Sequence, residues 1–310
     1  MIFEIAALIA GLAIISYSSE KSVEYSSHIA RRMKIPPLVI GVVLVSLGTD
    51  IPEIANSIFS SYTGHGDINV GDTLGSSLTQ ISLVLGMVAL LIGTIKARRR
   101  NIALLGGAAI IAVALAAFTV LDGELTREDG LFLMASYFVL LAVSYKFSTT
   151  EFGDESLDLS HMKDGLAKTG VMLVLALAGV AIGAVTIVES VIRISSAVGI
   201  PEYFISFFVI GLGTSLPELA VEFAAARKKQ FGLLLGDMMG SNITDATFAL
   251  GIGPLIFPAA ISGEVIAPVA IYVVIASIAI VSLFAWREKI DRKAGVVLIA
   301  LYLLSYFFVI

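Results

Sequence analysis

Long apolar blocks separated by short polar breaks cover almost the whole chain. Most of these blocks reach or exceed the roughly 20 apolar residues that an α-helix needs to cross a bilayer. Because backbone groups in lipid must be hydrogen-bonded internally, such blocks predict helices rather than open sheets. We therefore expect an all-α membrane protein with ten transmembrane helices at residues 2–30, 36–62, 69–93, 101–121, 128–147, 167–196, 202–226, 231–258, 263–286 and 293–310.

One long polar segment, residues 148–166, divides these blocks into two groups of five. We interpret it as a cytoplasmic linker between a first repeat, residues 1–147, and a second repeat, residues 167–310. Alternate loops carry the basic residues, whereas the intervening loops carry only Arg127. The basic loops are predicted to be cytoplasmic, which places both termini outside the cell membrane. Their basic residues are Arg31, Arg32, Lys34, Lys96, Arg98, Arg99, Arg100, Lys146, Lys163, Lys168, Arg227, Lys228, Lys229, Arg287, Lys289, Arg292 and Lys293.

Two short runs inside the apolar blocks are near copies of each other. Residues 48–53 read Gly-Thr-Asp-Ile-Pro-Glu, and residues 213–218, 165 positions later, read Gly-Thr-Ser-Leu-Pro-Glu. The same shift maps the Gly-Asp pair at 71–72 onto the pair at 236–237 without a gap. Since each half has an odd number of helices, the second half must enter the membrane from the opposite side. The halves are expected to be inverted repeats related by a pseudo-two-fold axis in the membrane plane.

Each of these runs predicts a break in a membrane helix, because proline lacks an N–H and glycine loosens the same turn. A break frees backbone carbonyls and gathers other oxygen donors around it. Hard oxygens around a pair of carboxylates suit Na⁺ or Ca²⁺. The expected donors are carbonyls near Ser46 and Gly211, the hydroxyls of Thr49 and Thr214, and the carboxylates of Glu53 and Glu218.

The next predicted helix of each half carries a Gly-Ser pair followed one to two turns later by a polar residue. Small residues let helices approach closely, so Ser76 and Ser241 are expected to reach the ion site. Gln80 and Asp245 face the same side as these serines. A carboxylate in lipid costs several kcal/mol, and few basic partners lie at that depth, so cations or protons must neutralise the acids. The acids expected to meet at the midplane are Glu53, Glu218, Asp245 and Asp50.

The paired motifs, at residues 46–80 and 211–245, resemble those of the sodium/calcium exchangers in the Ca²⁺/cation antiporter superfamily. The resemblance covers nearly the whole chain and implies a secondary antiporter that exchanges Ca²⁺ for Na⁺ by alternating access. It implies that Glu53 and Glu218 are shared by both ions and that the first and sixth helices slide as a gating pair. The other implied ligands are Thr49, Thr214, Ser215, Ser76, Ser241, the carbonyls of Ser46 and Gly211, and a middle layer of Gln80 and Asp245.

Three positions of the first half depart from the family pattern. Asp50 stands where the second half and the family have Ser, Ser77 stands where Asn is usual, and Gln80 stands where Asn or Asp is common. We interpret Asp50 as ion-facing, which gives a site with four acids. An exchanger coupled to H⁺, or one that prefers another divalent cation such as Mg²⁺, therefore stays an open alternative.

Composition limits the other function classes. The 310 residues are 57% hydrophobic and 15% charged, with a mean hydropathy of +0.96, which excludes an ordinary soluble domain. The net charge of −5 gives no indication of nucleic-acid binding, and the lack of cysteine excludes thiolate metal sites. We expect a monomer embedded in the lipid bilayer that binds inorganic cations, has no cofactor and is not an enzyme.

Two readings from other classes remain. An intramembrane aspartyl hydrolase would use Asp72 and Asp237, but the first glycine of its usual Gly-x-Gly-Asp run is replaced by Asn69 and Leu234. A channel would generally form its pore through oligomeric symmetry, whereas this chain contains its own internal pair of halves.

For Asp72 and Asp237, a helix N-cap is as reasonable a role as an ionic one. Glu24 and Glu189 are expected to pair with Lys21 and Arg193 or to make structural hydrogen bonds.

Overall fold

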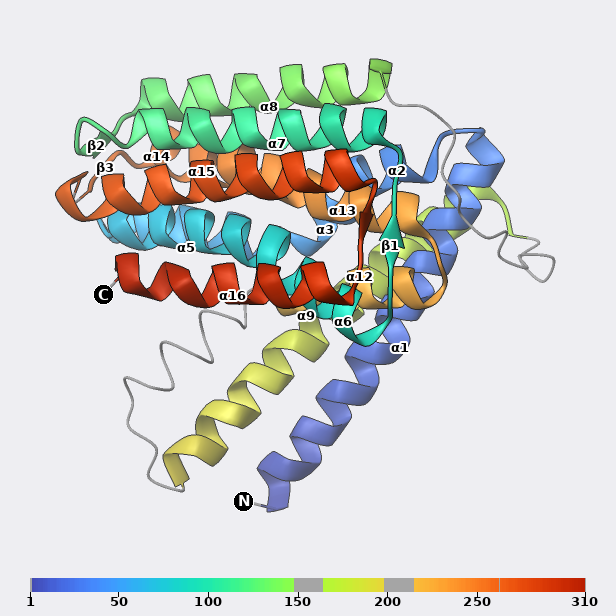
Figure 1. Cartoon of the computed structure of the whole chain (residues 1–310). Helices are drawn as coiled ribbons and strands as arrows, with labels where there is room; N and C mark the ends of the chain where they lie inside the picture. The colour runs from blue at the N-terminus through green and yellow to red at the C-terminus, as the bar shows by residue number, and fades with distance from the viewer. Residues whose placement is uncertain (1, 148–163, 198–214, 262, 310) are drawn as a thin grey trace.

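The computed structural model describes residues 2–147, 164–197, 215–261 and 263–309, and it is almost entirely helical (Figure 1). Three of its helical stretches, labelled η, are π-helical. The first half contains α1 (Ile2–Met33), α2 (Pro37–Ile40), η1 (Gly41–Val45), α3 (Ser46–Thr49), α4 (Ile51–Tyr62), α5 (Gly66–Leu78), η2 (Thr79–Val84), α6 (Leu85–Leu91), β1 (Ile95–Lys96), α7 (Arg99–Thr119), β2 (Glu124–Leu125) and α8 (Arg127–Phe147).

The second half repeats this order of elements. It contains α9 (Leu166–Ala197), α12 (Leu216–Arg227), α13 (Phe231–Ile243), η4 (Thr244–Ala249), α14 (Leu250–Ile256), β3 (Ala259–Ala260), α15 (Gly263–Arg287), β4 (Lys289–Ile290) and α16 (Arg292–Val309). From α4 to α6, every helical boundary of the first half recurs 165 residues later, from α12 to α14. Gly211 and Thr214 lie outside the described residues.

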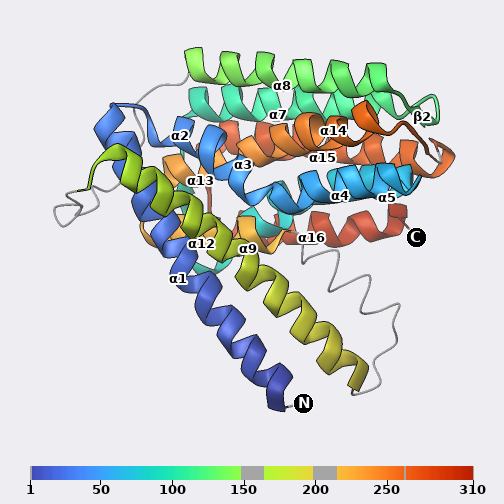
Figure 2. The same ribbon diagram turned by 180° about the vertical axis from the view of Figure 1, so that it is seen from behind.

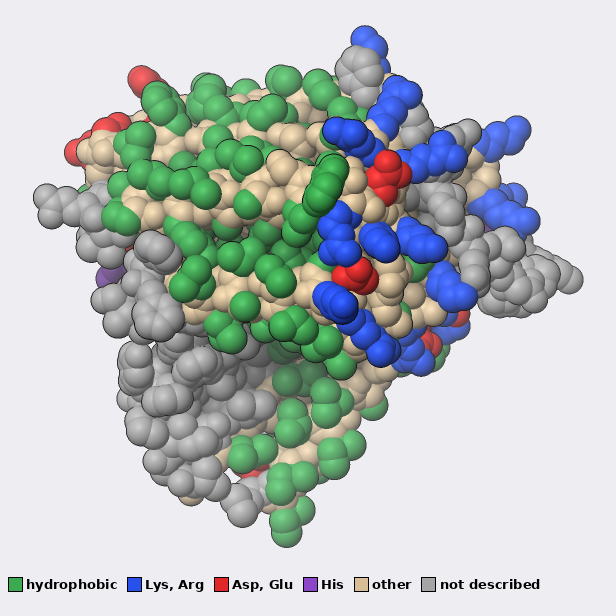
Figure 3. All heavy atoms as spheres, viewed as in Figure 1, with side chains coloured by type: hydrophobic (Ala, Val, Ile, Leu, Met, Phe, Trp, Pro, Cys, Tyr) green, Lys and Arg blue, Asp and Glu red, His purple; other side chains and the backbone are tan. Residues whose placement is uncertain are grey.

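The described helices are those of a membrane protein. Six of them are long and apolar enough to cross a bilayer, and the series α2–α3 together with α4 passes the same test as one span bent by 47°. Apolar side chains cover most of the face seen in Figure 3, whereas Lys and Arg side chains gather at the end of the bundle where β1 lies. This one-sided basic band is the pattern that the loop charges predict.

Two short strand pairs tie the halves together. Strand β1 pairs antiparallel with β4, and β2 pairs antiparallel with β3. The shift of 165 residues maps β2 onto β4, and it maps β1 onto β3 with an offset of one residue. The two strand pairs are therefore equivalent. Each half therefore contributes one strand to each pair, as an exact or near two-fold arrangement requires.

Glycines allow symmetric close contacts between helices of the two halves. A Cβ built on Gly86 of α6 would lie 2.8 Å from the carbonyl oxygen of Gly295 on α16. The repeat counterparts behave alike, since a Cβ on Gly251 of α14 would lie 2.9 Å from the carbonyl oxygen of Gly130 on α8. Small residues at these crossings let the helix backbones approach closely, as membrane helices require.

Helices α1 and α9 form an antiparallel pair that runs obliquely to the other long helices (Figures 1 and 2). Close approaches join Gly11 to Ile187, Ile15 to Gly183, and Ser18 to Gly179. The resemblance assigns gating to these first and sixth helices, and their shared packing makes them one structural unit.

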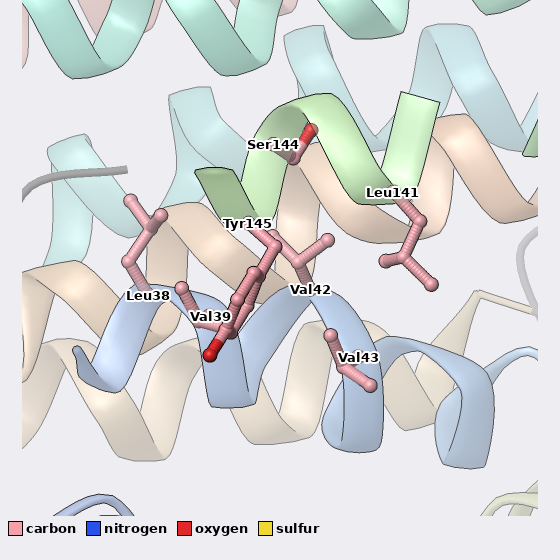
Figure 4. A pocket seen from close by; sticks show the side chains of 7 residues that line it. All are labelled: Leu38, Val39, Val42, Val43, Leu141, Ser144 and Tyr145. Carbon is pink, nitrogen blue, oxygen red and sulfur yellow. The ribbon is translucent and has the colours of Figure 1, made fainter. Parts of the chain in front are cut away.

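A small pocket lies between the α2–η1 stretch and the end of α8 (Figure 4). Its walls are mainly apolar, and none of the candidate acids lines it. The lining residues are Leu38, Val39, Val42, Val43, Leu141, Ser144 and Tyr145.

Candidate cation-binding site

The bend between α3 and α4 positions the first acidic run. Pro52 has no N–H to offer the carbonyl of Gly48, so the regular helical hydrogen bonds are interrupted there. Asp50 takes the position between the two helices with φ −78° and ψ 7°. Ser215, its counterpart before α12, has φ −86° and ψ 7°. Asp50 and Ser215 therefore lead into α4 and α12 with the same backbone conformation.

The break lies beyond the carbonyl of Ser46. That carbonyl accepts hydrogen bonds from the amide of Asp50 at 2.9 Å and from the hydroxyl of Thr49 at 3.1 Å. The Ser46 hydroxyl in turn donates to the carbonyl of Val42 at 2.6 Å. The Ser46 carbonyl is therefore hydrogen-bonded within its own segment, because the helical ladder continues to Asp50.

The π-helical stretches η2 and η4 bring the middle polar layer together. The amide of Gln80 donates to Asp245 Oδ2 at 3.2 Å, and the amide of Asn242 donates to Gln80 Oε1 at 2.7 Å. Gln80 and Asp245 occupy equivalent positions of the two repeats. Two equivalent residues can touch only where they lie at the symmetry axis, so this contact marks the pseudo-two-fold axis. π-Helical turns within α-helices are frequently associated with functional sites.

The four candidate acids are buried and lack hydrogen-bond partners for most of their oxygens. Asp50, Glu218 and Asp245 are 0% exposed, and Glu53 is 3% exposed. Neither carboxyl oxygen of Glu53 or Glu218 has a hydrogen-bond partner, and one oxygen each of Asp50 and Asp245 also has none. Buried charges without partners are very costly, so these oxygens are suited to ligands that bring positive charge.

These acids are neighbours across the two halves. The Asp50 carboxyl lies near Glu218 and near the hydroxyls of Ser241 and Thr244. Glu53 lies within charge-repulsion range of Glu218 and Asp50. Within the described part of the chain, however, no three acidic or imidazole side chains are placed to share one metal ion. Hydroxyl, amide and carbonyl oxygens would therefore have to complete any ion's coordination.

The predicted serine and threonine donors that the structure describes are buried, as the candidate acids are. Ser215, Ser241, Ser76 and Thr49 are all buried. The hydroxyls of Ser215 and Ser241 have no hydrogen-bond partner. A Cβ on Gly240 would meet the Ser46 hydroxyl at 2.9 Å, so α13 lies directly against the helix before the break. Ser46 thus lies against α13, the helix that carries Ser241.

For Asp72 and Asp237 the sequence left a helix-cap role and an ionic role equally open, and the structure contradicts the cap. Helix α5 begins at Gly66 and α13 begins at Phe231, so both aspartates lie well inside their helices. Asp72 accepts a hydrogen bond from the amide of Asn56 at 2.7 Å. Asp237 is fully buried, and neither of its carboxyl oxygens has a partner.

The acids of α1 and α9 take part in ion pairs. Glu24 binds Lys21 at 2.7 Å, as expected, and also binds Lys228 at 2.8 Å. Glu189 pairs with Arg193 at 3.2 Å. The bond from Glu24 to Lys228 links α1 to the loop after α12, and sequence spacing gave no indication of it.

Sequence reasoning missed three residues of this region. Asn242 was noted only as a family position, yet its amide holds Gln80. Thr244 lies beside Asp50. Glu222 is fully buried without a hydrogen-bond partner, and a comparison of the halves could have found it because the first half has Ser57 at that position.

Comparisons with known proteins extend over nearly the whole chain. A family described as "Sodium/calcium exchanger protein" matches residues 3–146 and 168–310. The chain is 32% identical to the inner membrane protein YrbG of Escherichia coli, covering 96% of this chain and 93% of that protein. It is 28% identical to the sodium/calcium exchanger MaX1 of Methanosarcina acetivorans, covering 95% of each.

Solved structures also match this chain over nearly its whole length. The sodium-calcium exchanger NCX_Mj, soaked with 10 mM Na⁺ and zero Ca²⁺, superposes with a TM-score of 0.83 at 31% identity. The match covers 99% of this chain and 98% of that one. With zero Na⁺ and Ca²⁺ the TM-score is 0.85 at 30% identity, with 99% of each chain covered. The predicted fold class is therefore confirmed.

Proposed function

Because the chain belongs to the sodium/calcium exchanger family of membrane cation exchangers, we propose that it exchanges Ca²⁺ for Na⁺ across the cell membrane. The observation that carries this proposal is the group of buried carboxyls beside the pseudo-two-fold axis. Glu53 and Glu218 are buried and have no hydrogen-bond partners to balance a negative charge. Cations that move through the site would supply that balance.

The proposed ion ligands come from the paired sequence motifs, and the burial of the described acids supports them. Glu53 and Glu218 act as the acids shared by both ions, with Asp50 and Asp245 beside them. Ca²⁺ takes six to eight oxygens, so neutral donors must complete its shell around these carboxylates. The donors proposed for this role are the hydroxyls of Thr49, Thr214, Ser215, Ser76 and Ser241, the amide oxygen of Gln80, and the carbonyls of Ser46 and Gly211. The carbonyl of Ser46 has the weakest support, since two donors already occupy it.

Competition for the same acids explains how two ions can be exchanged. One divalent cation or several monovalent cations neutralise the carboxylates, and only the neutralised site is compatible with burial in an apolar layer. The oblique α1–α9 pair supports alternating access, because its contact with the rest of the bundle is the surface along which it would slide (Figures 1 and 2). The ten helices form two five-helix repeats joined by a linker at residues 148–166, and the protein works as a monomer.

The basic band supports an orientation in which that end of the bundle faces the cytoplasm (Figure 3). Both termini would then face outside. Cysteine scanning offers a direct test, since the chain has no native cysteine. A cysteine placed in the loop after Lys96 should be protected from an impermeant thiol reagent added outside intact cells.

Flux in proteoliposomes tests the exchange itself. An outward Na⁺ gradient is expected to drive uptake of ⁴⁵Ca²⁺, and the Glu53→Gln/Glu218→Gln double variant is expected to abolish it. Asp72→Asn is a matched control, because this aspartate is buried to a lesser degree and is held by Asn56. Exchange that survives in the double variant would refute the proposed site.

Coupling to H⁺ is the second candidate, and the position of Asp50 favours it. This additional carboxyl is 0% exposed and lies beside Glu218, so a negative charge on both carboxyls at once is energetically costly. A pH gradient that drives ⁴⁵Ca²⁺ uptake without Na⁺ would select this candidate. Uptake that requires Na⁺ selects the first.

A further inference from the structure

The second half contains a carboxyl pair outside the central site. Glu222 of α12 and Asp237 of α13 are both 0% exposed. None of their four carboxyl oxygens has a hydrogen-bond partner. The helices pack against each other, and the two carboxyls lie close enough for like-charge repulsion.

Helix geometry places this pair between the central site and the basic end of the bundle. Glu222 lies four residues after Glu218 on α12, and Asp237 lies four residues before Ser241 on α13. Residues four apart lie one turn apart on the same helix face. Both steps lead toward the α12–α13 connection at residues 228–230, within the basic band.

The basic residues of that connection do not neutralise the pair. Arg227 binds Glu20 at 3.3 Å, and Lys228 binds Glu24 at 2.8 Å, so both pair with acids of α1. Within the described residues, no Lys, Arg or His side chain forms a hydrogen bond with Glu222 or Asp237. Their oxygens are therefore as poorly compensated as those of the central acids.

The first half is built differently at the equivalent positions, Ser57 and Asp72. The Ser57 hydroxyl accepts a hydrogen bond from the amide of Gly253 at 3.2 Å. Asp72 accepts one from the amide of Asn56 at 2.7 Å. In the first half, protein groups therefore hydrogen-bond to the side chains at these two positions. In the second half, the two carboxyls at these positions have no hydrogen-bond partner.

We propose that Glu222 and Asp237, together with the hydroxyl of Thr49, form an additional Na⁺ site on the basic side of the central site. Thr49 lies beside Asp237. Its hydroxyl hydrogen is directed at the carbonyls of Val45 and Ser46, at 3.2 and 3.1 Å, which leaves its oxygen lone pairs available.

The donor set favours Na⁺ over Ca²⁺. Two carboxyls and one hydroxyl offer at most about five oxygens, fewer than the six to eight that Ca²⁺ takes. Neighbouring buried carboxyls seldom carry two charges, and one monovalent cation balances a single charge. Asp50 lies within charge-interaction range of both acids, so the site connects directly to the central one.

This inference rests on the proposed sodium coupling, and its test counts bound ions rather than transport. Equilibrium binding of ²²Na⁺ to the purified full chain at saturation is expected to fall by one Na⁺ per chain in Glu222→Gln/Asp237→Asn. Asp72→Asn, at the equivalent position of the first half, should leave the count unchanged. An unchanged count in the double variant overturns the site, including the case in which the pair holds only a proton.

A second variant distinguishes loss of the Na⁺ site from misfolding. Glu222→Ser installs the residue that the first half has at this position, and it is expected to lose the same Na⁺ while eluting as a monodisperse peak. A folded Glu222→Ser protein with the wild-type count also overturns the site. The proposed exchange function fails separately, if the wild-type protein shows no Na⁺-driven ⁴⁵Ca²⁺ flux.

Discussion

Helix α13 lies so close to α2 that a single added methyl group should disturb the site. A Cβ built on Gly236 would lie 2.1 Å from the carbonyl oxygen of Leu38, whereas real Cβ atoms essentially never approach another heavy atom within 3.0 Å. The backbone of α13 fixes the position of the Cβ, and the carbonyl oxygen belongs to the backbone of α2. Rotation of a side chain therefore cannot relieve the overlap. We expect Gly236→Ala to push the two helices apart by about 0.9 Å.

The energetic cost follows from this overlap. Overpacking a well-packed interior costs about 1–3 kcal/mol, and a clash between backbones belongs at the upper end of that range. Alanine has a higher helix propensity than glycine, and this difference stabilises the helix by up to about 1 kcal/mol. A net loss of about 2 kcal/mol is therefore expected, visible as a clear fall in the unfolding temperature of the purified protein in detergent. The shift also separates Asp50 from Ser241, so Ca²⁺ affinity should fall.

Gly107→Ala provides the matched control. No described atom lies within 4 Å of a Cβ built at Gly107, and the residue lies in the middle of α7. The same substitution should therefore leave the unfolding temperature unchanged or raise it slightly. If Gly236→Ala melted at or above the temperature of Gly107→Ala, the inferred backbone contact between α2 and α13 would be refuted.

Three further outcomes are expected. Gln80→Leu removes the amide that holds Asp245, leaves a buried acceptor unsatisfied, and should lower Ca²⁺ affinity by about tenfold, measured by ⁴⁵Ca²⁺ binding. Asp50→Ser should change ion selectivity and the pH dependence of flux, and unchanged profiles would show that Asp50 does not face the ion. The amide of Ala294 lowers the pKa of Asp291, outside the membrane, so this carboxylate stabilises the fold above its unfolded pKa. The stability difference between wild type and Asp291→Asn should therefore shrink as pH falls through the folded pKa; a gap that grows in acid would contradict this.

The sequence alone was enough to predict the all-α membrane fold, the duplicated order of elements and the break in the first half. These features depend on local chemistry: apolar length decides whether a segment spans lipid, and a proline breaks a helix wherever the helix lies. The shift of 165 residues was readable because the duplicated polar runs kept their spacing. Asp50 could be singled out because Ser215 stands at its equivalent position.

Only the tertiary structure decided which side chains face one another. The contact between Gln80 and Asp245 locates the symmetry axis, and no spacing within either helix could have predicted it. The same holds for Glu222 and Asp237, whose spacing along the chain gives no sign that both lie unsatisfied in one interface. The physical reason is that helix propensity and hydropathy are properties of a segment, whereas partners for a buried charge depend on how separate segments pack.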